Sequence, residues 1–307
     1  MKDQEEDDSS PAKLIPVVDA VAGITAGCAT TLIVHPLDLI KVRLQVSKQR
    51  SHIGSVLEVI RSLQESRRPF KEAYRGLIPN LVGNTMSWGA YFFWYEIFKN
   101  KLVRWRHFQS PDSDLGFVDY LSCAALSGSL TTLCTNPIWV IKTRMLSTNS
   151  DFQGAYTNML DGIRKIGCEE GFRGFYRGII PSLLGVSHGA VQLMLYEKMK
   201  QWYTDSMHQP NELSTMQYIT CSGLSKIGAS FALYPTQVLR SRLQQYNAAR
   251  MYLSTTDVII KTAREEGING FYKGLLPNLF RVVPATCVTF VVYENTKKYI
   301  NRSSINI

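Results

Sequence analysis

One pattern occurs three times along the chain, and it constrains the fold more than any other feature of the sequence. Each copy opens with a proline followed by apolar and basic residues: Pro36-Leu-Asp-Leu-Ile-Lys-Val-Arg43, Pro137-Ile-Trp-Val-Ile-Lys-Thr-Arg144 and Pro235-Thr-Gln-Val-Leu-Arg-Ser-Arg242. A Tyr-Arg/Lys-Gly turn follows in each copy, ending at Gly76, Gly178 and Gly274. Each copy closes on Tyr-Glu-x-x-Lys, starting at Tyr95, Tyr196 and Tyr293. Matched motifs at matched spacing indicate one supersecondary unit used three times.

Six long segments carry very few charges. The stretch from Leu77 to Tyr95 has none, and two of the others hold a single cation each, Lys226 and Arg281. A helix that crosses a bilayer needs about 20 mostly apolar residues, and the six segments reach that length: 14–40, 77–95, 115–141, 179–196, 213–239 and 275–293. A soluble α-solenoid is the alternative, but these spans exceed the usual length of buried helices. We therefore expect an all-α membrane protein with six spanning helices.

Each repeat is predicted to hold an apolar helix kinked at proline, a short amphipathic helix and a second apolar helix. The expected kinks are at Pro36, Pro137 and Pro235, because proline removes a backbone hydrogen bond inside a helix. Three such kinks at one depth suggest helices that bend together around a cavity. The amphipathic segments, near 53–66, 156–169 and 253–266, should lie along the membrane surface. The expected parts are an acidic N-terminal tail at 1–13, repeats at 14–104, 115–203 and 213–301, and a C-terminal tail at 302–307.

The charge distribution limits the class of partner. The formal net charge is +9, but Lys and Arg are scattered through loops and helix ends, whereas a nucleic-acid-binding chain usually gathers them on one face. Anionic lipid and an anionic solute are the better partners, and no nucleic acid is expected. The acidic first eight residues are unlike an Arg-rich transit peptide, so mitochondrial targeting would reside in the rest of the chain.

The sequence offers little for catalysis. There is no glycine-rich phosphate loop, metal-ligand cluster or nucleophile–base set, so we expect neither an enzyme nor a metal site nor a bound cofactor. The six cysteines form no CxxC pair and are best interpreted as small buried hydrophobes.

Two cations within the apolar segments indicate the kind of solute. Charges at membrane depth are costly and usually functional, and no acid is expected at the depth of Lys226 or Arg281. Snorkelling or a structural ion pair is the alternative role. The two cations fit a phosphate or carboxylate group, and Trp88, Tyr91 and Trp139 offer faces for a planar ring, although such aromatics often serve packing alone. His188 is a weaker candidate, because a lone histidine is as often a packing residue.

The two motifs, P-x-[DE]-x-x-[KR]-x-[KR] and [YF]-[DE]-x-x-[KR], resemble those of the mitochondrial carrier family over almost the whole chain. The resemblance implies six tilted helices in a three-fold pseudosymmetric barrel, with three short helices on the matrix side. It also implies a multi-pass protein of the mitochondrial inner membrane that works by alternating access. Two charge networks would close the cavity in turn on the matrix and cytosolic sides.

The cytosolic network is complete in the sequence. Glu and Lys three residues apart project from one helical face, so each Glu can meet the Lys of another repeat. The expected pairs are Glu96–Lys200, Glu197–Lys297 and Glu294–Lys99, braced by Tyr95, Tyr196 and Tyr293. Local surface pairs within each helix are the alternative.

The matrix network is incomplete. Asp38, Lys41, Lys142 and Arg240 fit the motif, but Trp139 and Gln237 replace the other two acids. Asp38 is expected to pair with Lys142, and Gln45 and Gln244 are candidate braces. The surplus positive charge predicts a weak matrix gate that attracts anions.

Several longer segments are similar to the FAD/folate branch of this family, among them Gly83-Asn-Thr-Met-Ser-Trp88, Leu224-Ser-Lys-Ile227 and Arg281-Val-Val-Pro-Ala285. By that resemblance Asn84 and Trp88, the stretch from Gly185 to Gln192, and Arg281 would contact the solute. We expect FAD as the transported substrate, with folate, pyrimidine nucleotides or NAD as alternatives. An uncoupling-type proton or anion leak is the alternative of a different class.

The resemblance also implies cardiolipin bound at the helix starts that follow Gly76, Gly178 and Gly274. Free amide groups at such helix starts favour anions, although an ordinary glycine turn explains these residues equally well. Glu170-Gly and Glu266-Gly precede two of the turns, whereas the first repeat, with Ser66-Arg-Arg-Pro69, lacks this element. A monomer is expected.

Overall fold

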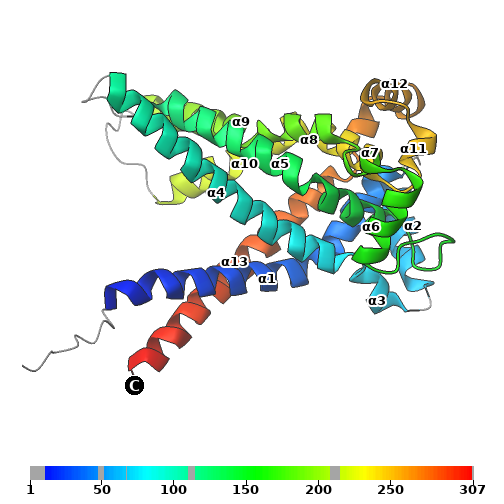
Figure 1. Ribbon diagram of the computed structural model, residues 1–307, viewed down its shortest axis with the longest axis horizontal. Helices are drawn as coiled ribbons and strands as arrows, with labels where there is room; N and C mark the ends of the chain where they lie inside the picture. The colour runs from blue at the N-terminus through cyan, green and yellow to red at the C-terminus, as the bar shows by residue number, and fades with distance from the viewer. Residues whose placement is uncertain (1–10, 48–51, 67, 110–114, 208–214, 306–307) are drawn as a thin grey trace, which may run out of the picture. The chain divides into compact units, whose positions relative to one another are not determined.

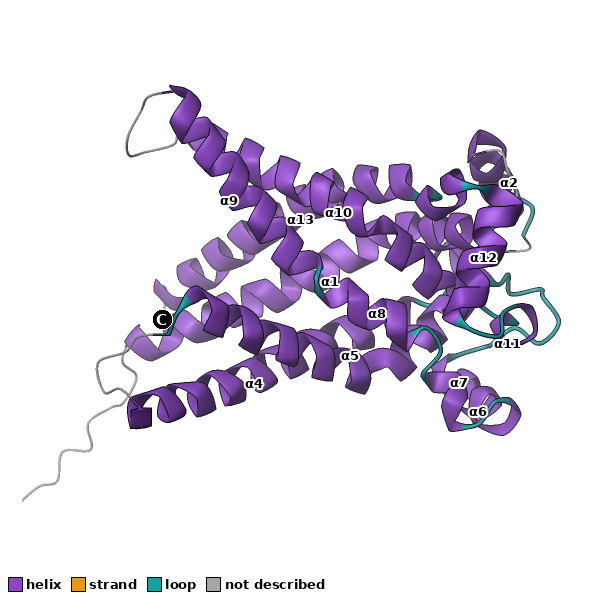
Figure 2. Cartoon of the chain, turned by 90° about the horizontal axis from the view of Figure 1, so that it is seen from above, coloured by secondary structure: helices purple, strands orange, loops and turns teal. Residues whose placement is uncertain are grey.

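The computed structural model describes residues 11–47, 52–66, 68–109, 115–207 and 215–305 (Figure 1). Most of the acidic tail expected at 1–13, the start of the third repeat at 213 and the last two residues of the tail at 302–307 lie outside the described residues. All regular secondary structure of the described residues is helical (Figure 2). The predicted all-α class is therefore confirmed.

The long helices coincide with the predicted apolar segments. They are α1 (Pro11–Val46), α4 (Leu77–Gln109), α5 (Phe117–Ser147), α8 (Ile179–Val186), α9 (His188–Met207), α10 (Thr215–Gln244) and α13 (Leu275–Ile305). Helices α1, α5 and α10 continue through the motif prolines Pro36, Pro137 and Pro235. Helix α13 also contains a proline, Pro284, for which no kink was predicted.

The fourth apolar segment is broken, although a single helix was expected there. Ser187 separates α8 from α9, and its amide donates to the carbonyl of Leu184 in a tight turn (3.2 Å). The Ser187 hydroxyl also donates to that carbonyl (2.6 Å). Gly185 and Gly189 flank the break, and glycine has low helix propensity. A tight turn inside a long helix often marks a functional hinge.

Three short helices occupy the predicted amphipathic segments: α2 (His52–Gln64), α6 (Met159–Glu169) and α12 (Thr255–Glu266). Side-chain caps fix two of the starts. Asn158 accepts from the amide of Asp161 (2.8 Å), and Ser254 accepts from that of Asp257 (3.2 Å). Such caps satisfy amide groups that the first turn of a helix leaves unpaired. The connecting pieces are α3 (Pro69–Ala73), α7 (Phe172–Phe175), α11 (Ala248–Met251) and the 3₁₀ helix η1 (Ile268–Tyr272).

Four of the described stretches are long and apolar enough to cross a membrane: Ala22–Val46, Phe117–Ser147, Phe172–Thr204 and Ile268–Ile300. The sequence predicted six spans. Helices α4 and α10 have the required length, at 33 and 30 residues, but they are less apolar. In α10 the reason is a row of polar residues on one face, which is described below.

The chain divides into two compact units, one formed by Met1–Asp38 with Pro277–Ile307 and the other by Leu39–Leu276. In the first unit, α1 and α13 contact each other, and the hydroxyls of Thr30 and Thr289 are 2.8 Å apart. In the second unit, α4 packs along α5, and α10 packs against α8 and α9 (Figure 1).

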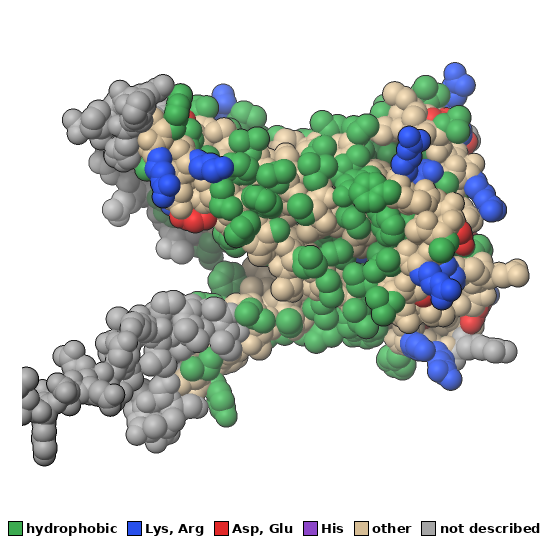
Figure 3. All heavy atoms as spheres, viewed as in Figure 1, with side chains coloured by type: hydrophobic (Ala, Val, Ile, Leu, Met, Phe, Trp, Pro, Cys, Tyr) green, Lys and Arg blue, Asp and Glu red, His purple; other side chains and the backbone are tan. Residues whose placement is uncertain are grey.

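The surface of the second unit is apolar along its long helices. Figure 3 shows hydrophobic side chains over the part of the visible face where α4, α5 and α8 run, while Lys and Arg lie toward its two ends, among them the end with α6 and α12. These helices carry large exposed side chains, including Phe93 of α4, Leu126 of α5 and Leu184 of α8. An apolar band of this kind suits contact with lipid.

Candidate functional site

A polar cavity of about 350 Å³ lies between α5, α8, the start of α9 and α10. Its polar lining consists of Thr132, Ser182, His188, Thr236, Gln237 and Arg240. The His188 ring contacts Ser230, with Nε2 and Oγ 3.3 Å apart. Two residues predicted for the matrix gate, Gln237 and Arg240, therefore share one cavity with a predicted solute contact, His188.

Lys226 lies on the same face of α10 as this cavity. Residues three or four positions apart lie on one side of a helix, and Lys226, Ser230, Gln237, Arg240 and Gln244 follow that spacing along α10. Lys226 itself is exposed and stands one turn before Ser230, the residue that contacts His188. This polar face explains the lower apolarity of α10, and it places Lys226 next to the cavity.

Trp139 holds two cations where the motif usually has an acid. Its indole Nε1 donates to the Ser87 hydroxyl of α4 (3.3 Å). The Lys142 Nζ is 4.7 Å from the centre of the ring, and the Arg240 Cζ is 5.5 Å from it. Each cation–π contact contributes about 0.5–2 kcal/mol, depending on how well it is desolvated. An aromatic face thus takes the place of a carboxylate between the second and third repeats.

The other predicted matrix-gate residues of this unit form hydrogen bonds with uncharged side chains. Lys41 donates to Gln237 (3.1 Å). Gln45 accepts from Ser241 (2.7 Å) and donates to Tyr234 (3.2 Å).

Gln244 makes the equivalent contacts between the third and second repeats. It accepts from Thr143 (3.2 Å) and donates to Asn136 (3.2 Å). Both glutamines therefore connect helices of different repeats, while their role in gating stays a prediction.

Arg281 is paired with an acid. In the unit of Met1–Asp38 and Pro277–Ile307, the Arg281 Nη1 donates to the Asp38 carboxylate. The expectation that no acid lies at the depth of Arg281 is therefore wrong. The residues are distant in sequence, and α13 brings Arg281 back to the end of this part of α1. The expected pair of Asp38 with Lys142 joins the two units and stays a prediction.

The predicted cytosolic gate shows local contacts. The carboxylate of Glu96 accepts from Asn100 of the same helix (3.1 Å), and Lys297 lies over the Tyr293 ring of its own helix at 5.7 Å. Among the described residues of Leu39–Leu276, Glu96 and Lys200 form no ion pair. This unit thus combines formed contacts at the matrix motifs with an unformed pair at the cytosolic motifs.

Three buried ion pairs were missed from the sequence. The last arginine of each proline motif is almost fully buried and pairs with a glutamate of the same repeat. The pairs are Arg43–Glu72 (2.5 Å), Arg144–Glu170 (2.5 Å) and Arg242–Glu266 (2.7 Å). The available signal was that three arginines inside long apolar helices require three acids.

In the first repeat the acid has moved by one helical turn. Arg68 occupies the position of Glu170 and Glu266, and Glu72 occupies that of Gly174 and Gly270. A Cβ at either glycine would lie 2.7 Å from the Cβ of the neighbouring glutamate, so in these two repeats the second position has no room for a side chain unless the local structure shifts. The first repeat carries side chains at both positions, Arg68 and Glu72, and has its acid at the second one.

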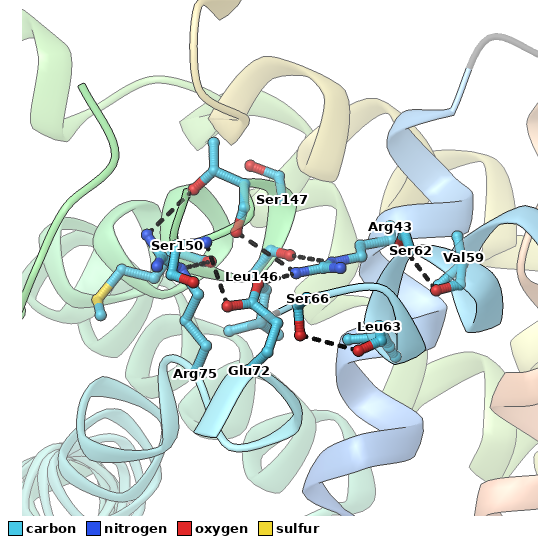
Figure 4. Close-up of polar contacts among 12 residues, drawn as sticks. Arg43, Val59, Ser62, Leu63, Ser66, Glu72, Arg75, Leu146, Ser147 and Ser150 are labelled. Carbon is cyan, nitrogen blue, oxygen red and sulfur yellow. Dashed lines mark hydrogen bonds and ion pairs between the residues drawn. The ribbon is translucent and has the colours of Figure 1, made fainter. Parts of the chain in front are cut away.

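Figure 4 shows the result of this exchange. Glu72 reaches Arg43 through one carboxylate oxygen and accepts from the amide of Ser150 (3.1 Å) through the other. Arg75 donates hydrogen bonds to the backbone carbonyls of Met145 (2.8 Å) and Tyr156 (2.9 Å). The equivalent Arg177 and Lys273 instead bind the glutamates of their own repeats (2.9 and 2.5 Å).

These contacts control the ionisation of the glutamates. Burial alone would raise the pKa of Glu170, but hydrogen bonds and charges from Arg144 and Arg177 lower that pKa below its ordinary value. Burial alone would likewise raise the pKa of Glu266, but hydrogen bonds and charges from Arg242 and Lys273 lower that pKa below its ordinary value. Both carboxylates are therefore ionised at neutral pH, and their ion pairs persist.

The three turn glycines have a packing role. Gly76, Gly178 and Gly274 have φ values of +76°, +72° and +79°, a region that favours glycine. A Cβ on Gly178 would lie 3.2 Å from the Arg240 carbonyl, and one on Gly274 would lie 3.1 Å from that of Lys41. Close packing against another repeat thus accounts for these residues, and cardiolipin binding there stays a prediction.

Three predicted solute contacts lie elsewhere in the second unit. Asn84 donates to Asn80 of its own helix (3.4 Å). Trp88 is exposed and stacks on Phe92, with ring centres 5.8 Å apart. Gln192 is half-buried in α9. None of these three is among the residues that line the cavity of His188 and Arg240.

Comparison with known proteins identifies the three repeats. The family model described as mitochondrial carrier protein matches residues 13–105, 113–207 and 211–304. The chain is 39% identical to the mitochondrial FAD carrier protein of Saccharomyces cerevisiae over 91% of this chain and 96% of that protein.

Two plant proteins are similar over comparable lengths. The identity to the chloroplastic folate transporter 1 of Arabidopsis thaliana is 39%, covering 92% of this chain and 96% of that protein. The identity to the mitochondrial nicotinamide adenine dinucleotide transporter 2 of the same plant is 36%, covering 92% of this chain and 80% of that protein. With three copies of the family model and relatives that match nearly end to end, this chain belongs to the mitochondrial carrier family.

Proposed function

We propose that the protein transports FAD across the mitochondrial inner membrane by alternating access. The observation that carries this proposal is the arrangement of Trp139 with Lys142 and Arg240. It combines an aromatic face with two cations at the edge of a polar cavity. FAD combines planar rings with a negatively charged pyrophosphate, so one site of this kind can recognise both parts.

The relatives support the same substrate. The yeast protein named as a mitochondrial FAD carrier shares 39% of its residues with this chain. All three relatives described above are named as carriers or transporters, which supports the proposal that FAD is cargo and not a prosthetic group. We further propose that the carrier works as a monomer with cardiolipin bound at its matrix-side helix starts.

Folate is the second candidate. The plant folate transporter is as similar to this chain as the yeast FAD carrier is, and folate also joins a planar ring to anionic groups. The two differ in the anion, because folate presents carboxylates and FAD a pyrophosphate. The planar Arg guanidinium binds either group, whereas the compact Lys ammonium acts as a point charge.

The test is uptake into liposomes that contain the purified protein. The panel consists of FAD, FMN, a folate, UTP and NAD. We expect saturable uptake of FAD, and we expect Lys226→Ala and Arg281→Ala each to abolish it, because each removes a cation from the solute path. Lys226→Arg, which keeps the charge, serves as the matched control.

Thermal unfolding of the same preparations shows whether the variants are folded. Full FAD uptake by both alanine variants would contradict the assignment of Lys226 and Arg281 as solute contacts. Ion conductance without saturable uptake of any panel member would instead indicate a leak channel.

A further inference from the structure

The ion pair of Arg281 with Asp38 is unequal in accessibility. Both residues lie in the unit of Met1–Asp38 and Pro277–Ile307. The Arg281 side chain is 38% exposed, whereas that of Asp38 is 12% exposed. The carboxylate is thus covered by protein, and the guanidinium remains reachable for a solute.

Asp38 uses only part of the binding capacity of Arg281. A guanidinium has five N–H donors, and the bond to Asp38 uses Nη1. Carboxylates and phosphates are alternative ligands for the same fork of donors. A solute anion that binds Arg281 therefore either shares the guanidinium with Asp38 or displaces the carboxylate.

Sharing is electrostatically unfavourable. Two like charges in a site of low dielectric repel each other strongly, and a pyrophosphate carries more negative charge than a carboxylate. A strong anion overcomes the bond between Asp38 and Arg281, whereas a weakly charged or neutral solute gains too little to do so.

We propose that Asp38 is an internal competitor for Arg281 and thereby sets how strongly an anion must bind in order to occupy the site. The inference rests on the proposed function only in taking Arg281 as a contact of the solute. Asp38 lowers by the same factor the affinity of every anion that must displace it, so only solutes that gain enough from their own contacts still bind. It also returns to Arg281 when the solute leaves, which speeds release.

Kinetics separate this role from a purely structural role in the matrix gate. Without the competitor, Asp38→Asn lowers the KM for FAD and FMN and also lowers the maximal rate, because release slows. A gate defect alone changes the maximal rate and does not bring the common fall in the KM values that depends on Arg281. Gln237→Ala is the matched control, because it removes the Lys41 contact of the predicted matrix gate while both Asp38 and Arg281 are kept.

The experiment compares wild type, Asp38→Asn, Asp38→Glu and Gln237→Ala, each also in an Arg281→Ala background. Binding is followed as the ligand-induced rise in unfolding temperature, with pyrophosphate, phosphate and acetate as probes beside FAD, FMN and riboflavin. We expect Asp38→Asn to bind pyrophosphate and FAD about tenfold more tightly than wild type does, as loss of a competing charge-assisted hydrogen bond implies. Asp38→Glu keeps a carboxylate and should stay close to wild type.

The Arg281→Ala background decides the mechanism. There Asp38→Asn should bring no gain, because the competitor has lost its target and the two effects are not additive. An equal gain in that background, or no gain from Asp38→Asn in wild type, overturns the proposal. The inorganic probes keep the test independent of the substrate: tighter pyrophosphate binding by Asp38→Asn supports it even if FAD is not transported.

Discussion

At the scale of single residues, the unusual feature is Trp139. An acid at this position would face Lys142 and Arg240 and would bind them more strongly than an aromatic ring does, because a charge pair at low dielectric exceeds a cation–π contact. The ring contacts both cations without adding a negative charge beside them. A matrix gate closed by such contacts opens more readily than one closed by ion pairs.

We predict that Trp139→Asp slows transport several-fold. The new carboxylate would pair with Arg240 or Lys142 and over-stabilise the matrix-closed state. Initial rates of substrate uptake into liposomes measure the effect. Trp139→Phe keeps an aromatic face and should retain most of the rate, and faster transport by Trp139→Asp would refute this account of the gate.

At the scale of elements, the three proline-motif helices are each joined to a short connecting segment by a buried Arg–Glu pair. Removing one partner of a buried pair leaves an uncompensated charge and costs about 3–5 kcal/mol. The first repeat shows that the position of the acid is not fixed, since Glu72 reaches Arg43 from one turn later. What is required is a carboxylate at the guanidinium.

We predict that Glu72→Gly strongly lowers the unfolding temperature and that adding Arg68→Glu restores most of it. The double variant recreates the Glu–Gly arrangement of the other two repeats, with its acid at the earlier position. Thermal unfolding of the purified proteins measures both steps. If the double variant unfolds at the temperature of Glu72→Gly alone, then the two positions are not interchangeable.

Particular residues show how far the sequence determines these elements. The amphipathic helices and long apolar helices follow from local periodicity, and capping residues such as Ser254 set their starts. The break at Ser187 was missed because the segment around it carries no Lys, Arg, Asp or Glu and was therefore taken as one uninterrupted span. Glu72 was missed because a motif compared at fixed positions does not detect an acid displaced by one turn.

The pairing of Arg281 with Asp38 was missed for a different reason. The two residues are 243 positions apart, and only the packing of α13 against α1 brings them together. Periodicity predicts which face a side chain occupies, but it does not predict its partner on a distant helix.

At the scale of the whole molecule, the two ends of the second unit are in different states. Matrix-motif contacts such as Lys41–Gln237 are formed. Glu96 and Lys200, which the structure also describes, form no ion pair with each other. Alternating access requires that the cytosolic pairs form when the matrix-motif contacts break. The cytosolic pairs should therefore matter for the rate of the conformational change.

We predict that Glu96→Lys and Lys200→Glu each slow substrate exchange and that the two together restore it. Each single reversal places like charges opposite one another in the cytosolic-closed state, whereas the double reversal rebuilds an attractive pair. Exchange rates in liposomes give the coupling between the two sites. Additive losses in the double variant would show that these residues do not meet.

The glycine contacts have a consequence for chain length. Gly76 packs on Leu146, Gly178 on the Arg240 carbonyl and Gly274 on the Lys41 carbonyl, so the first repeat touches the second, the second the third, and the third the first. Each repeat therefore contacts both of the others through these glycines. Deleting any one repeat would strip its two neighbours of a partner at once, and a chain of two such hairpins is therefore an open fragment rather than a smaller carrier.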